Sequence, residues 1–551
     1  MRRKNPFRLA VVAVSAAVAA SMLGAPSSAG TQASTSAPVA DQVDAPVPDV
    51  DWRSCEWAAR LRCATARVPL DYDRPGGATI RLSLLKDPAN RPERRIGSLF
   101  VNPGGPGGSS VDFASQAGRA FGPRIRQRFD IVGIDPRGVG GTTNAVCKGP
   151  RRKHPMRPRV AFPFGHEQEK RWIKADTSDR SFCAKHHNQL FDHVSTADTA
   201  RDMDLIRQAL GDDRLTYYGI SYGSYLGSTY AAMFPDRVRA MVVDGVLDPV
   251  AWSTGRGDSA RSLGFSTRLR SGYGAYEALV SGLAECDRVG VTRCRAAGDV
   301  YGEWRTIVRK ARNDKLVVGG DKVRYSDLVS SALGSLYSRS SYRYLAGYIH
   351  WLHRGSTATS GSRAQRRADE RAARLGDRLH DIWRDRERRG LYGAGQQTPR
   401  AKRSINDPFA SIACSDSANP THPNAWIKAS KRDDYTMPWF GRLWTWASSI
   451  CSNWPGSSAD AFRGPWKTET STPLLVIGNA HDPATPITGA RAVNRLFDGS
   501  RLLMLDGWGH GALGESECVT SRMARYLVSQ RLPAAGMVCK PDRSLYPVRK
   551  H

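Results

Sequence analysis

The stretch Leu215–Gly227 reads LTYYGISYGSYLG, and it decides the fold. Its first five residues form a short apolar run typical of a buried strand, and residues 224–234 show the pattern of a helix. Between them, Gly219, Ser221 and Gly223 form a G-x-S-x-G motif. In a strand–turn–helix context this motif exposes a serine hydroxyl at the top of a sheet, because the flanking glycines permit the sharp turn. The stretch therefore predicts a nucleophilic serine, Ser221, on an α/β sheet.

Similar apolar runs recur along the chain, and most of them end in Gly, Pro or Asp. They cover residues 79–87, 98–102, 129–135, 240–244, 473–478 and 501–506. Together with a helical pattern at 198–210, they indicate a mainly parallel sheet covered by helices on both faces. The recurrence of strand-like apolar runs stops near residue 248 and resumes near residue 472. The stretch between is helical and polar, so we expect an inserted second domain.

A serine nucleophile needs a base, and the base needs an acid that orients it. Asp482 follows the run at 473–478, and His510 follows the run at 501–506. Both therefore lie at the carboxyl ends of strands, where an open parallel sheet binds its ligands. The chain order Ser221, Asp482, His510 is that of the α/β-hydrolases. The pattern predicts that these three residues form a catalytic triad on an α/β-hydrolase fold.

The same fold needs an oxyanion hole with two backbone donors. One is the N–H after the nucleophile, which belongs to Tyr222. The other comes from the loop after an early strand, where the sequence has Gly104-Gly105-Pro106-Gly107. We expect Gly105 to donate, with its neighbour Gly104 as the alternative. This loop lacks the spacing of a phosphate or dinucleotide cradle, and we expect neither a cofactor nor a metal.

The composition is that of a globular protein with a large core. The 551 residues are 40% hydrophobic and carry a net charge of +29, which excludes a disordered polymer, a collagen and a coiled coil. The densest basic cluster, Arg363–Arg403, interleaves acidic residues among its arginines, as solvated, salt-bridged helices do. No nucleic-acid-binding signature accompanies it, so we expect no nucleic-acid partner.

The N-terminus is typical of an exported protein. Basic residues precede the apolar stretch Leu9–Leu23, and Ser27-Ser28-Ala29 offers small residues for cleavage. We predict a signal peptide at 1–29 and a disordered leader or pro-segment at 30–48. The α/β-hydrolase core would then cover 49–248 and 472–551, with a cap domain inserted at 249–471. An uncleaved anchor is the alternative, but Leu9–Leu23 is short for a bilayer span.

Cysteine usage agrees with export to an oxidising compartment. The chain has ten cysteines and no C-x-x-C pair. The simplest hypothesis is five local, sequential disulfides. They would join Cys55 to Cys63, Cys147 to Cys183, Cys286 to Cys294, Cys414 to Cys451, and Cys518 to Cys539.

Several segments together resemble the secreted tripeptidyl aminopeptidases of the α/β-hydrolase superfamily, relatives of the prolyl iminopeptidases. The resemblance extends from residue 52 to residue 520. Besides the Asp482 and His510 segments, the matching pieces are Trp52–Cys55, Cys63-Ala64, Val68–Tyr72, Asn102–Gly107, Tyr218–Gly227, Ile412–Asp416 and Cys451–Pro455. It implies a secreted enzyme that removes short peptides from substrates with free N-termini. Since the N-terminal stretch is the one long apolar run in the sequence, we also expect no stable membrane insertion after signal cleavage.

An exopeptidase must bind the free α-ammonium, and a carboxylate of the inserted domain would serve. Asp416 is the candidate, because it lies in a segment similar to the family and beside a predicted disulfide. A turn or helix-capping role is the alternative for Asp416, and Asp407 is the alternative carboxylate. Asp135 and Arg137, in GIDPRGVG, are expected to brace the loop after their strand.

Two other functions remain open at this point. A secreted carboxylesterase on the same fold would have an apolar pocket without an amine-binding carboxylate. A non-catalytic binding protein on a hydrolase scaffold is disfavoured by the complete triad. The sequence does not predict the oligomeric state.

Overall fold

The computed structural model describes residues 43–118, 120–150, 157–388 and 404–548. The predicted signal peptide, 1–29, and residues 30–42 of the predicted leader lie outside the described residues. The described ranges all belong to one compact unit, Ala40–His551.

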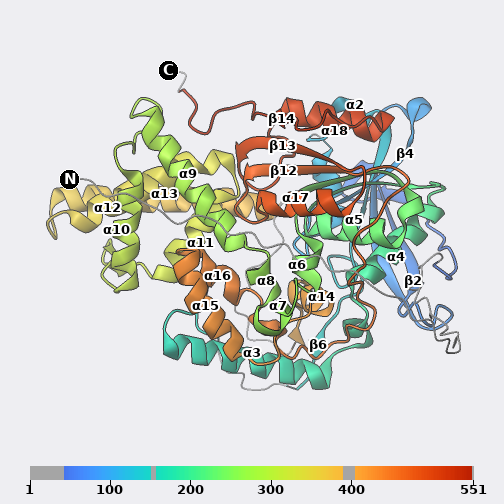
Figure 1. Cartoon of the computed structure of the whole chain (residues 1–551), viewed down its shortest axis with the longest axis horizontal. Helices are drawn as coiled ribbons and strands as arrows, with labels where there is room; N and C mark the ends of the chain where they lie inside the picture. Colours follow the sequence, from blue (N-terminus) through green and yellow to red (C-terminus); the bar gives the residue numbers. More distant parts are fainter. Residues whose placement is uncertain (1–42, 119, 151–156, 389–403, 549–551) are drawn as a thin grey trace, which may run out of the picture. The chain divides into compact units, whose positions relative to one another are not determined.

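A sheet of ten strands runs through this unit in the order β1-β2-β3-β5-β4-β7-β8-β12-β13-β14 (Figure 1). All neighbours from β5 to β14 are parallel, and β1, β2 and β3 add an antiparallel edge. The strands are β1 (Arg53–Cys55), β2 (Ala58–Pro69), β3 (Thr79–Asp87), β4 (Gly97–Asn102), β5 (Phe129–Ile134), β7 (Leu215–Ser221), β8 (Val238–Val246), β12 (Leu475–His481), β13 (Arg501–Trp508) and β14 (Val538–Cys539). The predicted, mainly parallel sheet is confirmed.

Helices cover both faces of this sheet, because successive strand residues point to opposite sides. In β4, Phe100 packs in the cluster on one face, whereas Leu99 and Val101 pack in the cluster on the other. The first face carries α4 (Thr196–Ala209), α5 (Tyr222–Met233) and α17 (Ile487–Leu496), and the second carries α1 (Ser110–Ala117), α2 (Gly122–Arg126) and α18 (Glu517–Ser529). Burial of both faces explains why the central strands read as continuous apolar runs.

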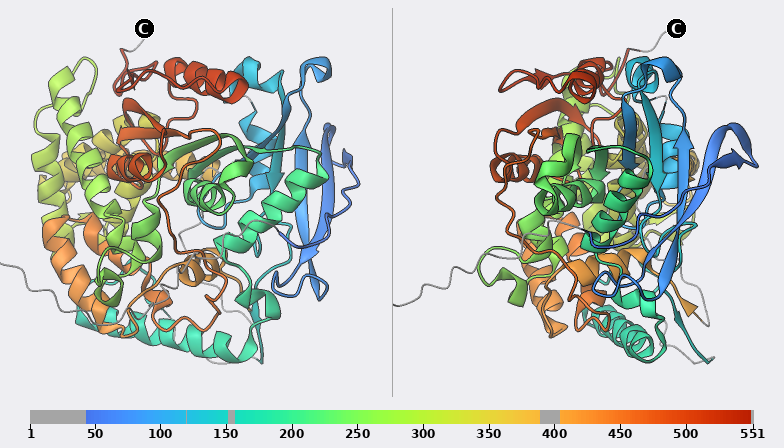
Figure 2. Two further views of the ribbon diagram at one scale, coloured as in Figure 1. Left: turned by 45° about the vertical axis from the view of Figure 1, so that its right-hand side comes forward. Right: turned by 90° about the vertical axis from the view of Figure 1, so that its right-hand side faces the viewer.

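A mainly helical insertion separates β8 from β12. It consists of α6 (Pro249–Ser253), α7 (Ser259–Ser262), α8 (Phe265–Arg268), α9 (Ser271–Val289), α10 (Val300–Arg312), α11 (Tyr325–Leu336), α12 (Tyr342–Thr357), α13 (Arg363–Arg388), α14 (Pro408–Asp416), α15 (Asn424–Thr436) and α16 (Phe440–Trp446). A buried cluster of its own, which includes Leu279, Trp304 and Leu336, holds most of these helices together. Figure 2 shows them beside the sheet.

One helix from before the nucleophile strand also packs on the insertion. Helix α3 (His166–His186) places Trp172 in the buried cluster of the insertion, and the indole N–H donates to Ser449 Oγ at 3.1 Å. The sequence pattern assigned this helix to the core segment 49–248. Phe182 and Cys183 of the same helix pack in the cluster on the sheet, whereas Trp172 packs on residues far along the chain, and local periodicity does not reveal this second contact.

Short elements and disulfides complete the fold. Two small ribbons pair β6 (Cys147–Lys148) with β11 (Ser404–Ile405) and β9 (Val317–Val318) with β10 (Asp321–Lys322). The cysteines pair sequentially, as predicted: Cys55–Cys63, Cys147–Cys183, Cys286–Cys294, Cys414–Cys451 and Cys518–Cys539. In the described part of the chain, every helix is too short or too polar to cross a bilayer.

Candidate active site

Ser221 stands at the sharp turn between β7 and α5. Its backbone has φ 60° and ψ −126°, a conformation that is costly for a residue with a side chain. A Cβ at Gly219 would lie 2.3 Å from the carbonyl oxygen of Gly223, and a Cβ at Gly223 would lie 2.7 Å from that of Asn102. Only glycine fits on either side, so the G-x-S-x-G motif is required by the turn itself.

The catalytic histidine and aspartate that the sequence predicts meet at the same edge of the sheet. His510 Nδ1 lies 3.0 Å from each carboxylate oxygen of Asp482. The backbone N–H groups of Ala484, Thr485 and Gly511 also donate to this carboxylate, at 2.8–2.9 Å. The pairing orients the imidazole with Nδ1–H toward the acid and leaves Nε2 for another partner.

The charge state of Asp482 follows from these partners. Burial alone raises the pKa of its carboxyl group, but the neighbouring His510 and the backbone donors outweigh burial and lower the pKa below 3.8. Asp482 is therefore ionised at neutral pH, as an orienting acid must be.

Neighbouring contacts bring the Ser221 turn against the His510 loop. A Cβ at Gly511 would lie 2.3 Å from the side chain of Ile220, the residue before the serine. Ser221 pairs with Val246 of β8, and a Cβ at Gly245, one residue earlier, would lie 3.4 Å from His510 Cε1. The structure thus gathers all three predicted triad residues at one place, the carboxyl edge of the sheet.

The insertion touches this loop as well. The His510 N–H donates to the carbonyl oxygen of Tyr337 at 3.0 Å, and the two rings meet edge to face at 5.1 Å. Tyr337 follows α11, so the insertion helps to hold the histidine. Asn479 also holds the His510 loop in place, because its side-chain amide donates to the carbonyl oxygens of Gly509 and Gly511.

The glycine loop after β4 lies directly against the Ser221 turn. A Cβ at Gly104 would lie 2.8 Å from both Ser221 Cβ and the Tyr222 nitrogen. The Gly104 N–H already donates to Asn102 Oδ1 at 2.8 Å, which removes it as an oxyanion donor. Among the hydrogen bonds of the described residues, none is donated by the Gly105 N–H. The geometry favours Gly105 over Gly104.

The prediction that Asp416 binds a substrate ammonium is not supported. Asp416 ends α14 and is 1% exposed, and it accepts from the Thr196 N–H at 2.8 Å and from the Thr196 hydroxyl at 2.6 Å. Trp252 Nε1 lies 3.4 Å from the same carboxylate. The Tyr222 hydroxyl in turn pairs with the Thr196 hydroxyl. Asp416 therefore braces the helices behind the serine turn, and its oxygens are occupied from within.

Asp416→Asn should change the pH dependence of stability. Burial raises the pKa of this carboxyl group from 3.8 to about 6, although the Thr196 hydrogen bonds lower it. A raised folded-state pKa adds stability that is fully present below about pH 4 and is lost as the pH rises through 6. The variant should lose that slope, a difference of about 3 kcal/mol between pH 4 and 7. Urea unfolding at each pH measures it. Asp258→Asn, an exposed site, is the control, and a wild-type slope in Asp416→Asn would contradict the assignment.

Asp407, the alternative carboxylate, lies at the start of the same helix. Its Oδ1 accepts from the Ala410 N–H at 3.0 Å and so caps α14. The next residue, Pro408, packs on the oxyanion loop, because a Cβ at Gly107 would lie 3.2 Å from Pro408 Cβ. The residue after Asp407 therefore contacts the loop that lies against Ser221.

Asp244 is a site residue that the sequence pattern did not single out. It is 1% exposed at the end of β8 and accepts from the Ala512 N–H and the Tyr218 hydroxyl. Burial raises the pKa of Asp244 to about 6, against these hydrogen bonds. It holds the chain just after His510. The one sequence signal that could have pointed to Asp244 is its position at the end of an apolar run.

Asp135 and Arg137 brace their loop, as expected. Asp135 accepts from the Ser109 hydroxyl and from the N–H groups of Val111 and Gly141. Arg137 is fully buried and makes a two-pronged ion pair with Asp202 at 2.8 Å.

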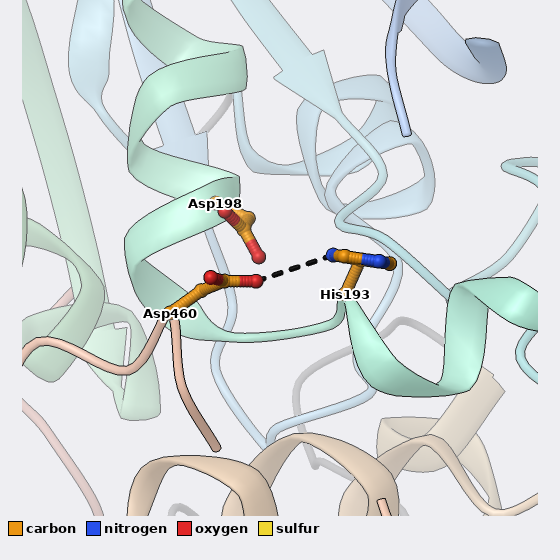
Figure 3. A group of neighbouring side chains, drawn as sticks. All are labelled: His193, Asp198 and Asp460. Atoms are coloured by element: carbon orange, nitrogen blue, oxygen red, sulfur yellow. Dashed lines mark hydrogen bonds and ion pairs between the residues drawn. The ribbon is translucent and has the colours of Figure 1, made fainter. Parts of the chain in front are cut away.

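One group of described side chains could offer three ligand atoms to a metal. In Figure 3, His193, Asp198 and Asp460 face one another, and His193 Nδ1 lies 3.2 Å from Asp460 Oδ2. Asp198, however, already accepts from the Ser195 hydroxyl at 2.9 Å and from Arg201 at 2.8 Å. Because the Arg201 guanidinium already pairs with Asp198, we interpret the three side chains as part of an ion-pair network at the start of α4.

Comparison with known sequences agrees with this fold. Residues 97–267 match the family described as alpha/beta hydrolase fold, and residues 436–539 match TAP-like protein. Carboxylesterase B of Mycobacterium tuberculosis is 32% identical over 98% of this chain and 99% of its own length. Serine protease Hip1 of the same species is 28% identical over the same shares. Tripeptidyl aminopeptidase of Streptomyces lividans is 28% identical over 90% of this chain and 88% of its own.

These relatives are similar over almost the whole chain, and the matched regions include the Ser221 turn at one end and the Asp482–His510 pair at the other. The chain therefore belongs to the α/β-hydrolase family that contains the tripeptidyl aminopeptidases, and it is a serine hydrolase.

Proposed function

We propose that the chain is a secreted serine exopeptidase that releases tripeptides from substrates with free N-termini. The observation that carries the catalytic part is the placement of the strained Ser221 turn against the His510–Asp482 pair. Peptide substrates are supported by relatives named tripeptidyl aminopeptidase and serine protease. Export is supported by five disulfides, which persist in oxidising compartments. We also propose that residues 249–471 form a cap domain inserted into the α/β-hydrolase core.

The reaction we propose is acyl transfer. Ser221 Oγ attacks the scissile carbonyl while His510 Nε2 takes its proton, and ionised Asp482 stabilises the imidazolium that forms. His510 then gives the proton to the leaving amine, which departs as the shortened peptide. Water repeats the sequence on the acyl-enzyme and releases the N-terminal fragment.

The oxyanion of each tetrahedral intermediate would lie between the backbone N–H groups of Tyr222 and Gly105. Tyr222 is the first residue of α5, so its N–H has no acceptor one turn earlier in the helix. Donors fixed in this way stabilise the transition state by about 3–4 kcal/mol each. No metal or cofactor enters this mechanism.

Gly104→Ala tests this loop. Its Cβ would lie within 2.8 Å of Ser221 and Tyr222, and at φ +87° alanine is strained, so the loop and its Gly105 donor must move. We expect kcat to fall by roughly 10²–10³-fold, the loss seen when an oxyanion donor is removed. Gly107→Ala carries the same backbone strain in the same loop, at φ +100°, but its Cβ would lie 3.2 Å from Pro408 and would not approach Ser221, so a larger loss in Gly104→Ala measures the clash with the serine turn. Equal losses in the two variants would count against the assignment.

We propose that Asp407 binds the substrate ammonium, because the residue after it contacts the oxyanion loop whereas Asp416 is enclosed. Asp407→Asn keeps the helix cap, since Asn caps as well as Asp, and removes the negative charge. We expect KM for free N-terminal substrates to rise about tenfold, with hydrolysis of an uncharged ester unchanged. A parallel loss on both substrates would mean that Asp407 has a structural role only.

A tripeptidyl arylamide tests the function as a whole. The measurement compares hydrolysis of the substrate with its amino end free and acetylated, and Ser221→Ala serves as the blank. Cleavage of the free form alone establishes an exopeptidase. Equal cleavage of both forms would favour the second candidate, a carboxylesterase or general hydrolase, which the name of the relative with 32% identity supports. Cleavage of neither amides nor esters would favour a non-catalytic binding protein.

A further inference from the structure

A cavity of about 230 Å³ lies beside the loop that carries Asp482. Its walls come from the segment after β8, from the end of α8 and from the first turns of α17. In Figure 1, α6, α8 and α17 are drawn near one another at this place. The volume is below the range of cavities that hold drug-sized molecules, so the cavity suits a small ligand.

Positive charge dominates the walls. Four arginines line the cavity, namely Arg256, Arg268, Arg270 and Arg495, and Asp248 is the one carboxylate among its lining residues. Asp248 is already paired with Arg256 at 2.7 Å. Within the described ranges, no carboxylate lies at ion-pair distance from the other three arginines. Among the described residues, the three positive charges of Arg268, Arg270 and Arg495 therefore remain without a counter-charge.

The partners of these arginines are neutral. Arg268 donates to five backbone carbonyls, those of Ala251, Trp252, Ser253, Leu263 and Ala418. Burial lowers the pKa of Arg268 to about 10, which still leaves it charged at neutral pH. Arg270 lies over the ring of Tyr273 at 5.1 Å, and Arg495 is exposed at the end of α17.

We propose that this cavity binds a small phosphate-type oxyanion, either inorganic phosphate or the phosphate group of a monoester. A doubly charged anion matches the guanidinium groups of Arg270 and Arg495, whose planar forks bind phosphate oxygens in pairs. Arg268 adds only its charge, because its five N–H groups all donate to backbone carbonyls. The first turn of α17 also lines the cavity, through Thr488 and Gly489. This site is separate from the proposed catalytic residues and does not rest on the proposed function.

The cavity nevertheless adjoins the catalytic acid loop. Thr485 lines it, and the Thr485 N–H donates to Asp482 at 2.8 Å while its hydroxyl lies 3.2 Å from His510 Nδ1. Val246, which pairs with Ser221, lines the cavity too. A bound anion would therefore tie the loop between β12 and α17 to the segment that enters the insertion.

Thermal unfolding of the full chain tests the site. Inorganic phosphate is titrated at constant ionic strength, with sodium chloride replacing it, and glycerol 3-phosphate is titrated in parallel. We expect a saturable rise in Tm of roughly 2–3 °C at a hundredfold excess over Kd. A rise in Tm with inorganic phosphate, with glycerol 3-phosphate or with both supports the site. The ligand that gives the rise shows whether the site takes free phosphate, a phosphate monoester or either one.

Charge-removing variants locate the binding. Arg270→Gln with Arg495→Gln should abolish the rise, and Arg495→Gln alone should weaken the apparent affinity about tenfold. Arg491→Gln is the matched control, because Arg491 is exposed on the same helix but does not line the cavity. The control should respond as the wild type does. No rise in the wild type, or an equal rise in all of these proteins, would overturn the proposal.

Discussion

Replacement of Ser221 by alanine is expected to lower kcat by roughly 10⁶-fold, the loss found when a triad nucleophile is removed. This hydroxyl is the group that we propose forms the acyl bond, and contacts of the neighbouring residues bring the turn against the histidine loop. The fold should survive, because alanine at this position keeps the backbone and removes one exposed oxygen. Single-turnover hydrolysis of the arylamide measures the loss, and a thermal melt checks the fold.

Ser228→Ala is the matched control for that variant. Ser228 lies two helical turns further along α5, is fully buried, and its hydroxyl has no hydrogen-bond partner among the described residues. This variant should retain wild-type kcat. A Ser221→Ala protein with more than about a hundredth of wild-type activity would show that another residue is the nucleophile.

Asp482→Asn is expected to lower kcat by about 10⁴-fold. The carboxylate accepts from His510 Nδ1 and from three backbone N–H groups. An amide at this place offers one acceptor instead of two and turns a donor toward the ring, so it favours the wrong tautomer of the histidine. Substrate KM should change little, because Asp482 is buried behind His510. The measurement is kcat and KM on the same arylamide.

An exposed aspartate on the neighbouring strand serves as the control for Asp482→Asn. Asp506 lies in β13, four residues before His510, and faces solvent. Asp506→Asn removes the same charge near the site without touching the histidine, and it should keep most of the activity. Comparable losses in the two variants would mean that the effect is one of general charge and not of orientation.

The placement of Ser221, Asp482 and His510 at one edge of the sheet could be predicted from the sequence, because the sequence signals for each residue are local. The Ser221 turn needs glycine on both sides, and both glycines belong to the five consecutive residues of the G-x-S-x-G motif. Asp482 and His510 each follow an apolar run, and parallel strands bring such ends to one edge. The disulfides are also local in sequence, so the sequential pairing was the simplest arrangement.

The supporting roles of Asp416 and Asp244 could not be predicted, because their partners lie far away in the chain. Asp416 is 220 residues from Thr196, the residue it holds, and no pattern near either of them records that contact. Asp244 contacts Ala512 across 268 residues. A family-like segment suggested that Asp416 was important but not why, and only its burial distinguishes a bracing carboxylate from one that binds substrate.

Labelling with a fluorophosphonate probe tests the central claim most directly, because the probe reacts only with an activated serine. The wild-type chain should take up one equivalent, and mass analysis of the digest should place the adduct on the peptide that contains Ser221. Asp482→Asn should react far more slowly, and Ser228→Ala should react at the wild-type rate. An unlabelled wild-type chain, or an adduct on any other serine, would contradict the account of this site.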